Sequence, residues 1–220
     1  MSTQTSPFDS LESPALLQEQ VYQQIRHLLI TGQLAPGQKL VIRTLAEQMG
    51  TSPMPVRDAL QRLAAQGVLS GKRTLCVPEL SGQDVNDILS IRLQLEILAV
   101  EHVIERATDS EIASLEDEYQ ALEAAVARNN AHAFLQANAH FHLKIALLAH
   151  SQMLVSTVEP LWLRMGPTIK LLPHERAHLP AVLPVHRRIL DALVARDVTA
   201  ARQAIRDDLL NTNMDQPLRT

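Results

Sequence analysis

Six of the seven glycines in this 220-residue chain lie between Gly32 and Gly82, and only Gly166 lies beyond them. Glycine most readily takes the backbone conformations of tight turns, so turns are concentrated in the first third of the chain. Aromatic residues make up only 3% of the sequence, while alanine, leucine and glutamine, which favour helices, are frequent. The pattern predicts a mainly α protein with a turn-rich amino-terminal part followed by long helices.

The charged residues divide at the same place. Between Arg26 and Arg73 seven basic residues stand against two acidic ones, a net charge of +5. From Ser81 to the end, 13 basic residues stand against 18 acidic ones, a net charge of −5. We therefore expect a basic domain over residues 15–79 and a helical domain over residues 80–215. A basic first domain favours a polyanionic partner.

Disulfide-linked and membrane-spanning proteins are excluded at this stage. The single cysteine, Cys76, cannot form an internal disulfide, and no apolar run approaches the roughly 20 residues of a membrane span. The opening MSTQTSPFDS lacks the basic and apolar parts of a secretory signal. We expect residues 1–14 to be a disordered amino terminus and the protein to be cytoplasmic, with no membrane partner.

The basic domain has the spacing of a helix-turn-helix. A helix over residues 17–28 precedes the turn QLAPGQ, and a short helix over residues 43–49 follows it. Ser52 as cap and Pro53 in the first turn then start another helix. Beyond it, the β-prone segments GVL and LCV flank the basic turn SGKRT. Three helices and a small β-hairpin, or wing, are predicted.

The third of these helices presents Arg57 and Gln61, four residues apart, on its exposed side. A helix of this size fits the major groove of DNA, where arginine can pair with guanine O6 and N7. Lys72 and Arg73 of the wing would then reach the adjacent backbone or minor groove. The same spacing also occurs in plain packing units, so spacing alone leaves DNA binding and packing open.

The stretch from Val21 to Leu69 contains GQLAPGQKL, RTLAEQMGTS and PVRDALQRLAAQGVL. It closely resembles the winged-helix domain of the GntR regulators. The resemblance implies that Arg43 and Arg57 contact double-stranded DNA, that Ser52 contacts a phosphate and that Lys72 belongs to the wing.

Two positions depart from the pattern of this family. Pro53 stands where the family usually has arginine, and Ile42 stands where it usually has glutamate. An arginine–guanine contact is worth about 1–3 kcal/mol of discrimination. We therefore expect an operator with fewer obligatory guanines, read by Arg57 with an apolar contact from Met54.

From Ser81 onward the sequence predicts helices in close succession. Ser81 with Asp84, and Thr108 with Glu111, both have the spacing of a capping box. The link LLPHERAHLP, bracketed by prolines, is expected to be a loop, and the residues around Trp162 are expected to belong to the core. Together these helices predict an antiparallel all-α bundle, with further helices over residues 131–149, 153–171, 183–195 and 198–210.

The first helix of the bundle, LSIRLQLEILAVEHV, is apolar nearly all round and still contains Arg92. A guanidinium group does not lose its charge in proteins, so Arg92 must meet an anion. That anion is either a carboxylate of the bundle or an anionic small molecule bound inside it.

Four polar residues are predicted to converge inside the bundle. Asn138 and His142 are four residues apart on one helix, which places them on the same face. His186 and Asp208 each lie eleven residues from Asp197, where two antiparallel helices turn, so they stand at the same height. Two imidazoles, a carboxylate and an amide oxygen suit a divalent zinc, nickel or manganese ion. A hydrogen-bonded core histidine is the alternative reading.

This half of the chain is similar to the FCD ligand-binding domain of the FadR-type GntR subfamily, through IRLQLE, NAHFH, VHRRILDAL and ARDVTAARQAIRDDL. In many such domains an aspartate and three histidines bind a metal at the positions of Asn138, His142, His186 and Asp208. Two of the four differ here, yet one carboxylate remains. The resemblance also implies that Arg92 grips the carboxylate of an organic acid. The segment PLWLRMGP resembles the McbR branch of the subfamily.

The sequence thus predicts a DNA-binding transcriptional regulator, a repressor controlled by a small organic acid with the help of a metal. One recognition helix covers only a few base pairs, so a homodimer on a palindromic operator is expected. Two alternatives stay open. One is a metal-free effector pocket; the other is a metal-dependent enzyme, for which no general base is evident.

Overall fold

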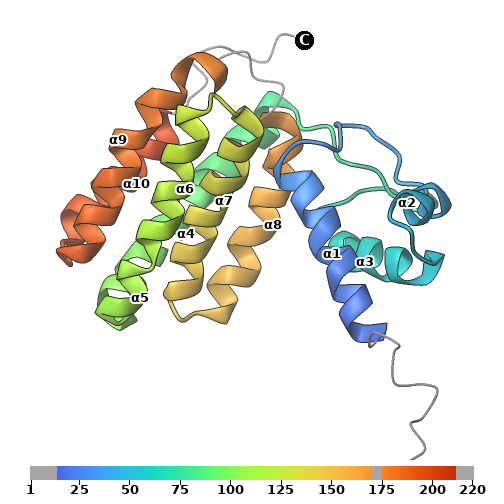
Figure 1. The fold of residues 1–220 in the computed structure, drawn as a ribbon, viewed down its shortest axis with the longest axis horizontal. Helices are drawn as coiled ribbons and strands as arrows, with labels where there is room; N and C mark the ends of the chain where they lie inside the picture. Colours follow the sequence, from blue (N-terminus) through green and yellow to red (C-terminus); the bar gives the residue numbers. More distant parts are fainter. Residues whose placement is uncertain (1–13, 170–174, 212–220) are drawn as a thin grey trace, which may run out of the picture.

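The computed structural model describes residues 14–169 and 175–211. A small unit of three helices lies beside a bundle of longer helices, and α1 and α8 face each other where the two meet (Figure 1). The helices are α1 Pro14–Ile30, α2 Ile42–Gln48, α3 Pro53–Ala65, α4 Gly82–Arg106, α5 Asp109–Ala113, α6 Leu115–Ala127, α7 Ala131–Leu148, α8 Gln152–Ile169, α9 Glu175–Val194 and α10 Val198–Asn211.

The first unit is the predicted helix-turn-helix. Leu45 of α2 packs in one buried cluster with Val56, Leu60 and Leu63 of α3. The α1 helix lies along α3 and contributes Ile25 to the same cluster. Apolar residues therefore fill the inner faces of the three helices, which leaves the outer side of α3 to polar side chains.

The predicted β-hairpin is smaller than expected. Ser70 and Cys76 exchange both backbone hydrogen bonds, at 3.0 and 2.8 Å, and Cys76 also bridges to Lys39. In the described residues these are isolated bridges and not extended strands. The turn between them depends on Gly71, whose φ is +109° and where a Cβ atom would lie 2.3 Å from the Thr74 carbonyl oxygen. A tight basic turn is therefore fixed beside α3.

The bundle is arranged around α4, which packs against α7, α8 and α10. Both predicted capping boxes are present at helix starts. Ser81 Oγ accepts a hydrogen bond from the Asp84 backbone N–H at the start of α4, and Thr108 does the same for Glu111 at the start of α5. No helix in the described ranges is long and apolar enough to cross a membrane.

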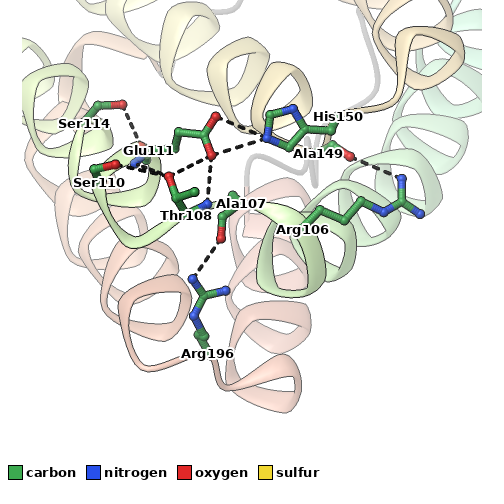
Figure 2. Close-up of polar contacts among 9 residues, drawn as sticks. All are labelled: Arg106, Ala107, Thr108, Ser110, Glu111, Ser114, Ala149, His150 and Arg196. Atoms are coloured by element: carbon green, nitrogen blue, oxygen red, sulfur yellow. Dashed lines mark hydrogen bonds and ion pairs between the residues drawn. The ribbon is translucent and has the colours of Figure 1, made fainter.

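Polar contacts tie the corners at one end of the bundle (Figure 2). Arg196, in the turn between α9 and α10, donates to the carbonyl oxygen of Ala107 at 2.8 Å. Glu111 accepts a 2.8 Å hydrogen bond from the Thr108 backbone and lies 3.3 Å from Nε2 of His150. The Arg196 contact joins the turn after α9 to the end of α4, and the His150 contact joins the end of α7 to α5.

The two units share one packed cluster. Trp162 of α8 belongs to the same group of buried apolar residues as Leu29 of α1. At Gly166 of α8 the helices approach so closely that a Cβ atom would lie 2.3 Å from the Leu29 carbonyl oxygen. Arg26 of α1 also forms an ion pair with Glu159 of α8. The helix-turn-helix unit is therefore docked on α8 by packing as well as by charge.

The link expected to be a loop is partly helical, so that prediction was wrong for residues 175–180. A proline removes one N–H group and crowds the preceding turn, but α9 continues through this segment. Its later part buries Val185, Ile189 and Leu193, and this packing favours an extended helix. His174, noted within this link, lies outside the described residues.

Candidate functional site

The residues predicted to contact DNA all lie on the outer surface of α2, α3 and the wing, and all are exposed. Among the described residues, none of these side chains has a hydrogen bond or ion pair within the protein. Arg62 of α3 differs, because it pairs with Glu19 at 2.9 Å and lies over the ring of Tyr22. The exposed set is Arg43, Ser52, Met54, Arg57, Gln61, Lys72 and Arg73.

Ser52 occupies the cap position of α3 but makes no capping hydrogen bond with its side chain. Its exposed hydroxyl group stays available to a phosphate, and because Pro53 and Pro55 have no N–H group, Met54 and Val56 hold the first backbone N–H groups of α3. Met54 follows with 59% of its surface exposed, a large value for a methionine in a small domain. The start of α3 thus presents the Ser52 hydroxyl group and the apolar side chain of Met54 together.

The four residues predicted to bind a metal are brought together inside the bundle. Nε2 of His142 lies 3.2 Å from Nε2 of His186 and 3.3 Å from Oδ2 of Asp208. Oδ1 of Asn138 lies 2.7 Å from Nε2 of His186. Nitrogen and oxygen ligand atoms of His142, His186 and Asp208 lie within 4.8 Å of one another, and all three side chains are buried.

The proton of His186 is placed by its other neighbour. Nδ1 of His186 lies 3.1 Å from the carbonyl oxygen of Val182, which can only accept, so Nδ1 donates. Burial lowers the pKa of His186, with smaller opposing contributions from nearby charges, so the ring is neutral and its Nε2 carries a lone pair. Nε2 also forms a hydrogen bond with the Asn138 amide group, at 2.7 Å, and lies 3.2 Å from Nε2 of His142. A carbonyl partner at Nδ1 is usual for a histidine whose Nε2 binds a metal.

The spacing of the donors fits one divalent ion. Two nitrogens bound to a zinc ion at about 2.0–2.1 Å and a tetrahedral angle stand about 3.3 Å apart. The separation between the imidazole Nε2 atoms of His142 and His186 is 3.2 Å, and that between His142 Nε2 and Asp208 is 3.3 Å. The side chains therefore fit a borderline divalent metal with imidazole and oxygen ligands.

The site is strongly charged for a buried place. Burial alone would lower the pKa of His142, but Glu96 and Asp208 outweigh it and raise that pKa to about 9. Burial alone would raise the pKa of Asp208, but His186 and His142 bring it down to about 2. The carboxylate of Asp208 is therefore ionised, as a metal ligand must be.

Arg92 lies next to this cluster and is 3% exposed. Its Nε donates to Oε1 of Glu96 at 2.9 Å, so the anion it meets within the described residues is a carboxylate of the bundle. Its Cζ lies 3.6 Å from the centroid of the Trp162 indole. The Trp162 indole also packs on the imidazole of His142, with ring centroids 5.2 Å apart. Arg92 is thus held in place at the edge of the cluster.

Sequence reasoning missed two residues of this site. Glu96 follows Arg92 by four positions, the spacing of a helical ion pair, and that signal was available. Its second oxygen lies 2.7 Å from Nδ1 of His142, a contact that depends on how α4 and α7 pack. Trp162 was read as core, and it is buried, but its contact with Arg92 and His142 has no local sequence signal.

Comparison with known proteins gives the same division. Residues 17–74 match the family "Bacterial regulatory proteins, gntR family", and residues 87–211 match the FCD domain. The chain is 33% identical over 192 residues to the HTH-type transcriptional regulator McbR of Escherichia coli, covering 84% of this chain and 86% of McbR. It is 27% identical over 200 residues to the regulator YdhC of Bacillus subtilis, covering 89% and 88%.

A solved structure, that of E. coli McbR/YncC, is similar over 91% of this chain and 95% of its own, with a TM-score of 0.83 and 31% sequence identity. These relatives are transcriptional regulators, and the predicted resemblance and mainly α fold are confirmed. Regulation of transcription, and not catalysis, is the function they share with this chain. The chain belongs to the GntR family of bacterial DNA-binding regulators and carries an FCD domain.

Proposed function

We propose that the protein is a repressor that binds a palindromic operator as a homodimer in the cytoplasm. A small organic acid, bound with a divalent metal ion in the FCD domain, changes its affinity for DNA. The observation that carries this proposal is the convergence of His142, His186 and Asp208, which are buried and whose ligand atoms lie within 4.8 Å of one another.

An acid is the expected effector because of the charges around the metal. With a divalent ion bound, His142 and His186 are neutral ligands. The ion and Arg92 then contribute three positive charges, against one negative charge each from Glu96 and Asp208. The buried site is left with one excess positive charge, which a monocarboxylate would neutralise. Arg92 can also receive a carboxylate on two parallel N–H groups.

DNA recognition is assigned to the exposed residues of α2, α3 and the wing. Arg57 would read a base edge in the major groove, with an apolar contact from Met54. Arg43 and Ser52 would hold phosphates, and Lys72 with Arg73 would reach the backbone or minor groove. Two copies related by a twofold axis would read two half-sites.

The effector is expected to act through α8. Trp162 contacts Arg92 and His142 on one side and belongs to the packed cluster of α1 on the other. A change in the site that moves this side chain alters how the DNA-binding unit is docked. A coupling of about 1–3 kcal/mol between two ligand sites is typical of allosteric proteins.

Two measurements on the native chain, purified without an affinity tag, test this proposal. Elemental analysis is expected to give about one divalent ion per chain, lost in His186→Ala. A thermal-shift screen of carboxylic acids is expected to find stabilising acids in the metal-loaded protein, because a ligand that binds only the native state raises its melting temperature. Arg92→Ala should remove those shifts and spare operator binding.

Acid-induced shifts that persist unchanged in chelator would favour a metal-free effector pocket. Equal shifts in wild type and Arg92→Ala would exclude Arg92 from acid binding.

A further inference from the structure

Glu96 is a buried carboxylate with two partners. It lies on the inner face of α4 with 3% of its surface exposed. Oε1 accepts from Nε of Arg92 at 2.9 Å, and Oε2 lies 2.7 Å from Nδ1 of His142. The second contact is an ion pair whose angles lie outside hydrogen-bond limits. Glu96 thus contacts both Arg92, which is proposed to bind the acid, and His142, which is proposed to bind the metal.

We propose that Glu96 is a positioning residue that sets both halves of the effector site. It fixes the His142 ring so that Nε2 is directed at His186 and Asp208. It also holds Arg92 by Nε, which leaves the terminal nitrogens of the guanidinium for a carboxylate. This inference rests on the proposed metal and acid site, and it assigns to Glu96 a role that the sequence comparison does not.

The two imidazoles of the site each have an outer partner. His186 has the carbonyl oxygen of Val182 at its Nδ1, at 3.1 Å, and His142 has Glu96 at its Nδ1, at 2.7 Å. A metal-bound histidine usually gives its second N–H to a carboxylate or carbonyl, and loss of that partner weakens metal binding by about 10–100-fold. Glu96 is the charged partner of the pair, so it also makes His142 a more basic ligand.

The orientation of Arg92 depends on the same carboxylate. Arg92 is held on one side by the indole of Trp162, with Cζ 3.6 Å from the ring centroid. Stacking alone leaves the guanidinium free to turn in the plane of the ring, whereas the bond from Nε to Glu96 fixes its direction. A guanidinium group fixed in this way loses less conformational freedom when it binds a carboxylate.

The test is the affinity for zinc alone, measured by competition with a chromogenic chelator. Glu96→Gln keeps the size of the side chain and removes its charge, and it should weaken zinc binding by about 10–100-fold. Glu101→Gln makes the same change on the same helix, where Glu101 pairs with Arg202 nearer the surface. This control should bind zinc as the wild type does. Glu96→Asp, which keeps the charge, should recover part of the affinity.

Glu96→Gln leaves the buried charge of Arg92 unpaired and could destabilise the fold. A double variant is therefore needed as a control for stability. The double variant with Arg92→Gln and Glu96→Gln removes both charges and should show the same loss of zinc affinity. The ¹⁵N chemical shifts of His142 give a further readout. Zinc should stay on Nε2 in the wild type and divide between both ring nitrogens once Glu96 is replaced.

The outcomes separate this inference from the proposed function. If the wild type binds no zinc, the proposed metal site fails and Glu96 has no ligand to position. If the wild type binds zinc and the double variant binds it equally well, with unchanged ¹⁵N shifts, the metal site stands and the role of Glu96 is overturned.

Discussion

The guanidinium of Arg92 lies over the indole of Trp162, with Cζ 3.6 Å from the ring centroid. Trp162 also packs on His142, and it is the single tryptophan of the chain. Its fluorescence therefore reports directly on the assigned site. Nickel is paramagnetic and quenches a nearby indole, so one equivalent of Ni²⁺ should quench the emission of the wild type.

His186→Ala should abolish this quenching by removing a ligand, and no other tryptophan complicates the signal. Nickel that elemental analysis finds bound, without any change in Trp162 emission, would place the ion elsewhere in the protein.

Asn138→Asp should have opposite effects with and without metal. The new carboxylate would lie beside His186, which also contacts Asp208, in a partly buried place, so the metal-free protein should lose stability, by about 1–3 kcal/mol. With metal bound, the carboxylate becomes a stronger ligand than the amide oxygen and the affinity should rise. Thermal unfolding in chelator and in Zn²⁺ measures both effects.

Asn130→Asp is the matched control on the same helix. Asn130 caps α7 by accepting from the Ala133 backbone, a task that aspartate performs equally well. Its metal affinity should stay at the wild-type value. If Asn138→Asp stabilised the protein in chelator, repulsion between the new carboxylate and Asp208 would not control stability at this place.

Gly166→Ala should loosen the docking of α1 on α8. The added methyl group would lie 2.3 Å from the Leu29 carbonyl oxygen and 2.8 Å from Cα of Ile30, both backbone atoms. Overpacking of this kind costs about 1–3 kcal/mol. Calorimetry should show a lower melting temperature, and operator affinity should respond less to the effector.

Gly82→Ala is the control, since a Cβ atom there meets nothing within 4 Å and the position starts α4. It should leave both stability and coupling unchanged. Equal behaviour of the two variants would mean that the close approach at Gly166 does not set the docking of the two units.

Pro53→Arg should change the operator. Pro53 is the first residue of α3 and is exposed, so arginine fits there without loss of the helix. Selection from random DNA is expected to give the wild type a site with fewer obligatory guanines than the usual family site. The variant should gain a guanine preference of about 1–3 kcal/mol. A wild-type selection that returned the usual site would contradict this account.

Much of the fold could be predicted because short sequence motifs mark where its helices begin. The capping boxes at Ser81 and Thr108 mark the starts of α4 and α5, and the cap and proline at residues 52–53 mark the start of α3. The convergence of His186 and Asp208 followed from their equal distance to the turn at Asp197. Spacing along helices was sufficient for these features. The domain limits at residues 15–79 and 80–215 stay predictions.

The rest depends on packing between helices that are distant in sequence. The contact of Glu96 with His142 depends on how α4 and α7 are aligned along their axes, and no local sequence pattern predicts that alignment. The docking of α1 on α8 at Gly166 likewise depends on two surfaces 137 residues apart, Leu29 and Gly166. The α9 helix begins at Glu175 although two prolines favour a loop, and its later part buries Val185, Ile189 and Leu193.

The most direct test measures operator binding while the site is filled. The acid that gives the largest thermal shift is titrated into the complex of protein and labelled operator, and fluorescence anisotropy reports the affinity. Operator affinity should change by about 5–150-fold in the wild type, and should not change in Arg92→Ala, in His186→Ala or in chelator. An equal change in all four samples would contradict the claim that the metal and Arg92 control DNA binding.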